Sequence, residues 1–107
     1  MRVYIAGPIT KGNQMENVRA AIDAADAVLR AGHAPYCPHL TLFWQVIFPA
    51  PYETWMKLGK EWLTVCHALI RLPGESEGSD REVAWARERG LPVFSSVEAF
   101  LTWTRPL

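Results

Sequence analysis

The feature that most constrains this fold is an alternation of short apolar runs with amphipathic helical patterns along the chain. The apolar runs have the length of buried strands, are bounded by glycine or proline, and occupy residues 2–7, 33–38, 67–74 and 91–94. Helical periodicity fills the intervals at residues 14–31, 52–65, 79–89 and 97–104. Such alternation indicates parallel strands with right-handed crossovers. We therefore expect a three-layer α/β sandwich with a parallel sheet of four to five strands.

Length and composition fit one globular domain. The chain has 107 residues, half of them hydrophobic, which suffices for a single core spanning 1–107. Lys plus Arg and Asp plus Glu number 11 each, so duplex nucleic acid is not an expected partner. The first residues read as a strand rather than a leader, and no apolar stretch has the length of a bilayer. Because two cysteines are also too few for a disulfide framework, we expect a cytoplasmic protein.

Ligands of parallel α/β sheets bind at the carboxyl ends of the strands, which directs attention to the loops there. The loop from Gly7 to Gly12 precedes a helix, and its amides together with Lys11 favour an anion such as phosphate. The loop lacks the spacing of a Walker or dinucleotide-binding motif. A plain Gly-Pro turn is therefore the alternative interpretation.

Another loop, residues 73–80, places acidic and serine side chains at the start of a helix. The run from Ser79 to Glu82 has the spacing of a capping box, in which Glu82 would bond the backbone of its own helix. Alternatively, the loop aims Glu82 at a ligand. The helix dipole would then keep its carboxylate ionised, as a nucleophile requires.

Four residues have side chains typical of zinc ligands: Cys37, His39, Cys66 and His67. The first pair follows the end of one strand and the second pair precedes the start of another, so the pairs lie at opposite edges of a parallel sheet. We therefore expect no metal site and no cofactor. His39 remains a candidate acid or ligand contact, because it lies at the edge where ligands bind.

Residues 40–55 do not fit the alternation. The segment is aromatic-rich, nearly free of charge and broken by Pro49 and Pro51. A long apolar connection of this kind is typical of core, a lid or a subunit contact. Because so small a domain cannot bury all of it, we expect a homodimer or higher oligomer, with this segment or the following helix in the contact.

Several stretches resemble the nucleoside 2-deoxyribosyltransferase-like superfamily, and together they cover nearly the whole chain. They are VYIAGPIT at 3–10, PHLTLFW at 38–44, YETWMKLGKEWLTVCHALIRLPG at 52–74 and LPGESEGSDREVAWARERGLPVF at 72–94. The most similar branch comprises small bacterial and phage proteins of uncharacterised function. The resemblance implies a flavodoxin-like (Rossmann-like) sheet. It also implies hydrolysis of, or base exchange at, the N-glycosidic bond of a nucleoside or nucleotide.

The resemblance further implies roles for particular residues. Glu82 matches the superfamily's nucleophile, a Glu at the opening of the helix after a small–Gly–small loop, and Tyr4 matches an aromatic hydroxyl that orients it. Glycosyl transfer to Glu82, and then to water or a second base, would retain configuration. His39, Glu77 and Asp80 are candidate donors of the proton that the departing base needs. The residues expected to hold sugar or phosphate are Gly7, Pro8, Ile9, Thr10, Lys11, Gly74, Ser76, Gly78 and Ser79.

Four positions depart from the superfamily pattern. Relatives usually carry Asp where this chain has His67, often another Asp at Gly59, and His at Leu42 and Gln45. Because carboxylates and imidazoles near the site are missing, the alternative to an enzyme is a non-catalytic nucleotide-binding oligomeric module. A structural oligomeric domain without a ligand is a third interpretation.

Overall fold

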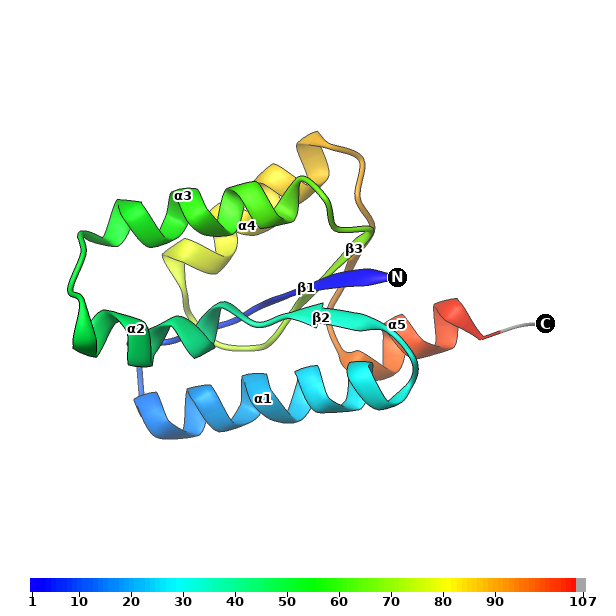
Figure 1. Cartoon of the computed structure of the whole chain (residues 1–107). Helices are drawn as coiled ribbons and strands as arrows, with labels where there is room; N and C mark the ends of the chain where they lie inside the picture. The colour runs from blue at the N-terminus through cyan, green and yellow to red at the C-terminus, as the bar shows by residue number, and fades with distance from the viewer. Residues whose placement is uncertain (106–107) are drawn as a thin grey trace.

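The computed structural model describes residues 1–105 and contains a parallel β-sheet flanked by helices on both sides (Figure 1). The strands are β1 (Arg2–Ala6), β2 (Ala34–Tyr36), β3 (Ala68–Arg71) and β4 (Val93–Phe94). The helices are α1 (Gln14–Arg30), the 3₁₀ helix η1 (Pro38–Leu40), α2 (Thr41–Ile47), α3 (Tyr52–Leu63), α4 (Glu77–Glu88) and α5 (Val97–Thr104). The sheet order is β2-β1-β3-β4, and every neighbouring pair is parallel. The predicted α/β architecture is thereby confirmed.

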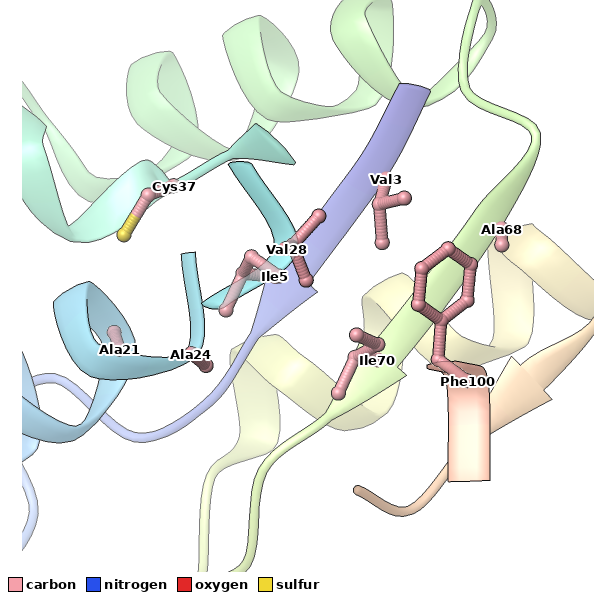
Figure 2. Close-up of a cluster of buried hydrophobic side chains, with 9 residues drawn as sticks. All are labelled: Val3, Ile5, Ala21, Ala24, Val28, Cys37, Ala68, Ile70 and Phe100. Carbon is pink, nitrogen blue, oxygen red and sulfur yellow. The ribbon is translucent and has the colours of Figure 1, made fainter. Parts of the chain in front are cut away.

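The sheet separates two apolar clusters. Successive β1 side chains point to opposite faces, so Val3 and Ile5 join one cluster while Tyr4 and Ala6 join the other. The first cluster lies beneath α1 and α5, and Figure 2 shows its members: Val3, Ile5, Ala21, Ala24, Val28, Cys37, Ala68, Ile70 and Phe100. The second lies beneath α3 and α4 and contains Tyr4, Ala6, Leu63, Cys66, Leu69 and Ala86. The sheet, the α1 and α5 layer on one face and the α3 and α4 layer on the other make the three-layer sandwich seen in Figure 1.

The start of α4 differs from the sequence prediction. The N-cap is Ser76, which has an extended backbone, and its hydroxyl oxygen accepts the N–H of Ser79 at 3.1 Å. The helix therefore begins at Glu77, so Ser79 lies in its first turn and Glu82 in its second. A side chain in the second turn cannot reach back to the cap. The predicted capping box between Ser79 and Glu82 is wrong.

The segment 40–55 contains α2, a helix that the alternation did not predict. None of the α2 residues is buried. The large apolar side chains that η1, α2 and the residue after α2 leave exposed are Leu40, Phe43, Trp44, Val46, Ile47 and Phe48. Core packing, one of the three interpretations of this segment, is therefore wrong for α2. Within residues 1–105, no helix combines the length and apolarity needed to cross a membrane.

Candidate active site

A cavity of about 430 Å³ opens at the carboxyl end of β1. Its walls come from four segments: β1 with its following loop, η1 with α2, the start of α3, and the loop that enters α4 together with the first two turns of α4. β1 and β3 are neighbours in the sheet, yet the chain leaves β1 for α1 on one face and β3 for α4 on the other. The cavity thus lies at the switch point where ligands of such sheets bind.

Glu82 and Tyr4 form a buried pair in the wall of this cavity. Tyr4 is fully buried and Glu82 is 7% exposed, and the Tyr4 hydroxyl donates a hydrogen bond to Oε2 of Glu82. Burial raises the pKa of Glu82 to about 7, although the Tyr4 bond and the charges of Arg71 and Arg81 act in the opposite direction. Burial, and then the neighbouring carboxylate, raise the pKa of Tyr4 far above its ordinary value, so the phenol stays protonated.

The expectation that the helix dipole keeps Glu82 ionised therefore fails. Dipole effects fade beyond the first turn of a helix, and Glu82 lies in the second turn of α4. Desolvation is the largest influence on this carboxyl group, so the charged and neutral forms are comparably populated near pH 7.

The two loops that flank the cavity are packed tightly against each other. A Cβ atom on Gly74 would lie 2.7 Å from Cγ of Pro8, and Gly74 has a φ of +116°, which disfavours other residues. A Cβ atom on Gly7 would lie 3.1 Å from Cβ of Leu72. The guanidinium of Arg71 donates to the carbonyl of Gly74 at 2.9 Å. Two of the three glycines predicted to bind substrate, Gly7 and Gly74, thus allow the two loops to approach closely.

Acidic groups predominate among the charged residues of the cavity. The Lys11 ammonium forms a salt bridge with Glu75 at 2.9 Å, and both side chains are largely exposed. Glu75, Glu77 and Glu82 all line the cavity, whereas Lys11 is the only Lys or Arg side chain of residues 1–105 that does so. The lysine predicted to hold a phosphate is therefore already paired with a carboxylate.

His39 lines the cavity but uses its ring nitrogens inside the protein. It is 2% exposed, and its Nε2 lies 3.0 Å from the carbonyl oxygen of Pro8, so Nε2 carries a hydrogen that it donates there. Its Nδ1 lies 3.9 Å from the Cys37 sulfur. Burial lowers the pKa of His39, so the ring is neutral at neutral pH. This arrangement ties η1 to the loop after β1.

Asp80 does not reach the cavity. It lies two residues before Glu82 on α4, and a two-residue step turns a helix by about 200°, so the two side chains project to opposite sides. Its carboxylate is 3.1 Å from the guanidinium of Arg71 and is largely exposed. Gly74, a predicted substrate contact, is not among the residues that line the cavity. The other predicted contacts do line it: Gly7, Pro8, Ile9, Thr10, Lys11, Ser76, Gly78 and Ser79.

The four departures from the superfamily pattern lie in different places. Leu42 and Gln45 line the cavity, and Oε1 of Gln45 accepts the Nε1–H of Trp55 at 2.6 Å. His67 lies at the far edge of the sheet, where its Nδ1 accepts the backbone N–H of Arg2 at 2.9 Å. Gly59 lies against the Tyr4–Glu82 pair. Among residues 1–105, no three His, Cys, Asp or Glu side chains converge as metal ligands would.

Sequence reasoning missed an apolar wall of the cavity. Leu42, Tyr52, Trp55 and Met56 line it, and they come from the segment interpreted as core, lid or subunit contact, or from the residue after it. The aromatic richness of that segment was the available signal. Aromatic richness alone could not show that part of the segment faces the cavity, because the segment has no clear strand or helix periodicity that would separate a cavity-facing side from a solvent-facing side.

The chain belongs to the family described as Domain of unknown function (DUF7768), whose model matches residues 1–96. No curated protein matches it in sequence. Its fold is similar to that of a 2-deoxyribosyltransferase from Bacillus psychrosaccharolyticus, with a TM-score of 0.66 and 20% identity over 87% of this chain and 69% of that one. Its fold is also similar to that of a 2-deoxyribosyltransferase from Leishmania mexicana, with a TM-score of 0.63 and 17% identity over 86% of this chain and 61% of that one. At these identities the likeness shows the flavodoxin-like fold.

Proposed function

We propose that this protein cleaves the base–sugar bond of a nucleoside, with Glu82 as the nucleophile. The observation that carries the proposal is the Glu82 carboxyl group, buried in the wall of a cavity at the switch point of the sheet and hydrogen-bonded to Tyr4. The similarity in fold to two 2-deoxyribosyltransferases supports this reaction class. The resemblance of the loop before α4 to the superfamily's nucleophile loop supports the choice of residue.

The chemistry is a double displacement. An oxygen of Glu82 attacks the anomeric carbon as the bond to the base breaks, which gives a glycosyl ester and a released base. Because Tyr4 engages Oε2, the other carboxylate oxygen is the one that attacks. Water or a second base then resolves the ester. In the dry wall of the cavity, a carboxylate stabilises the positive charge of the oxocarbenium-like transition state more strongly than it would in water.

The departing base takes its proton from Glu77. This residue, the first of α4, lines the same cavity as Glu82. The N–H of His39 is engaged by Pro8, and Asp80 is paired with Arg71 away from the cavity. Of the three donors suggested by the sequence, we assign this role to Glu77, because it lines the cavity and is not engaged as His39 and Asp80 are.

The substrate is a nucleoside rather than a nucleotide. A phosphate in the cavity would meet the negative charges of Glu75 and of ionised Glu82, and the lysine that could offset them is already bonded to Glu75. Repulsion between like charges raises the free energy of binding. A 5′-phosphate should therefore weaken binding and slow cleavage.

The experiment is chromatography of free base after incubation of the protein with 2′-deoxynucleosides and their 5′-monophosphates. We expect base release from at least one nucleoside and slower release from its monophosphate. Glu82→Gln should abolish release and Glu77→Gln should slow it, whereas Asp80→Asn, on the same helix but outside the cavity, should not. Release that persists in Glu82→Gln would rule out the nucleophile.

A second candidate function is a non-catalytic module that binds nucleosides or nucleotides as an oligomer. The glycine at position 59 favours this second function, because superfamily members often carry an Asp there and this chain therefore lacks a carboxylate beside Glu82. In that case nucleosides would raise the melting temperature by binding the native state, with no base released from any of them.

A further inference from the structure

Gly59 lies within α3, where nothing in the backbone requires a glycine. α3 runs from Tyr52 to Leu63, and glycine is less favourable than alanine in the interior of a helix. Among residues 1–105 the glycines with positive φ are Gly12, Gly32, Gly74 and Gly90, so Gly59 has an ordinary backbone conformation. The reason for a glycine at position 59 must therefore lie in the space around it.

That space is filled by the Tyr4–Glu82 pair. A Cβ atom at position 59 would lie 2.5 Å from the Tyr4 hydroxyl oxygen, 3.6 Å from its Cζ, and 3.5 Å from Oε2 of Glu82. Only the contact with the hydroxyl oxygen is too short for atoms that are not bonded. The conflict therefore concerns the one atom that donates to Glu82.

Tyr4 has little freedom to avoid such a contact. Its strand pairs with β2 on one side and β3 on the other, and its side chain is fully buried. Its ring packs on that of Tyr36, with centroids 5.4 Å apart. Any side chain at position 59 must therefore displace the hydroxyl from Glu82 or push α3 away from the sheet.

We propose that Gly59 is a positioning residue of the active site: its missing side chain lets α3 close over the Tyr4 hydroxyl and hold it on Oε2 of Glu82. The catalytic part of this inference rests on the proposed function, since Gly59 acts through Tyr4 on the nucleophile. Position 59 in this chain is thus not a vacant place for an acid. It is the place where the helix covers the tyrosine and keeps water from the carboxylate.

The test is a double-mutant cycle in stability. Gly59→Ala should lower Tm by about 4–8 °C, the response of a small domain to a moderate loss of stability. In a Tyr4→Phe background the same substitution should lower Tm only slightly or raise it, because the hydroxyl is gone and the ring carbon Cζ lies at an ordinary contact distance from the new Cβ atom. An equal loss of Tm on Gly59→Ala in the wild-type and Tyr4→Phe backgrounds would overturn the proposal.

Gly78 supplies a matched control for stability. A Cβ atom there would lie 2.5 Å from the Tyr52 hydroxyl oxygen, but Tyr52 is 56% exposed and can move aside. Gly78→Ala should therefore leave Tm unchanged or raise it, with the same effect in the Tyr4→Phe background. A gain in Tm from Gly59→Ala like that from Gly78→Ala would refute the close contact.

The activity cycle tests the positioning role. Gly59→Ala and Tyr4→Phe should each reduce the rate constant of base release, and the double variant should be no slower than Tyr4→Phe alone, since both act through one hydroxyl. Gly59→Asp should not restore or raise activity; an increase would show that position 59 needs an acid, against the proposal. If the wild type releases no base, the proposed function fails while the stability cycle still decides the contact.

Discussion

Glu82→Gln probes the buried carboxyl group with the least change in shape. The pKa of Glu82 is about 7 in the folded protein, against an ordinary value of 4.5. The folded state therefore binds this proton more tightly, and the associated stability is fully present below pH 4.5 and lost as pH rises to about 7. The difference between these values corresponds to about 3 kcal/mol, because each pKa unit is worth about 1.4 kcal/mol.

A glutamine at position 82 carries no charge at any pH, and its carbonyl oxygen can still accept the Tyr4 hydrogen bond. The free energy of unfolding should thus be similar for Glu82→Gln and wild type at pH 4.5. At pH 8 the variant should be more stable, by up to about 3 kcal/mol. Urea unfolding followed by tryptophan fluorescence at the two pH values measures this difference, with the m-value serving as a check that the exposed surface is unchanged.

Asp80→Asn is the control, because Asp80 lies on the same helix and its carboxylate is largely exposed beside Arg71. It should bring no gain in stability at pH 8. If Glu82→Gln is no more stable than wild type at pH 8, the carboxyl group is not desolvated as the structure indicates. On this reasoning, the carboxyl group that we propose as the nucleophile lowers the stability of the folded state at pH 8.

Three further predictions concern the rate, the helix cap and the assembly. The rate of base release should rise as the pH increases toward about 7, since only ionised Glu82 attacks; a rate that falls over this range in a pH profile would contradict this. In urea unfolding, Ser76→Ala should cost about 1 kcal/mol and Ser79→Ala less, because Ser76 is the N-cap; the reverse order would contradict the observed helix start. Light scattering at tens of micromolar should show a dimer or larger species that Phe43→Glu disrupts, because Phe43 is 78% exposed on an apolar helix; a monomeric wild type would refute assembly.

The sequence allowed the sheet and the main helices to be predicted because their periods are local. Strand runs and helical stripes lie within the segments that form them, so the starts of α1, α3 and α5 match their predicted starts. α2 was missed because it has only seven residues, five of them apolar, and Pro49 and Pro51 follow it. A helix of about two turns is too short to give a clear periodic signal.

The site was predictable only in part. The Tyr4–Glu82 pairing followed from a resemblance, because a contact between residues 78 positions apart has no local pattern. Ser76 and Ser79 both precede possible helix starts, and the capping-box spacing favoured the wrong one. The burial that raises the pKa of Glu82 depends on how α3 and α4 pack against β1, which composition does not reveal.

The nucleophilic role of Glu82 is tested most directly by mass spectrometry of the protein quenched during reaction with a 2′-fluoro-2′-deoxynucleoside. Fluorine at this position destabilises the oxocarbenium-like transition state and lets a glycosyl-enzyme accumulate. We expect an added mass equal to the sugar without its base, located in the peptide that contains Glu82 and absent from Glu82→Gln. Base release without any adduct on Glu82, or undiminished in Glu82→Gln, would contradict the mechanism.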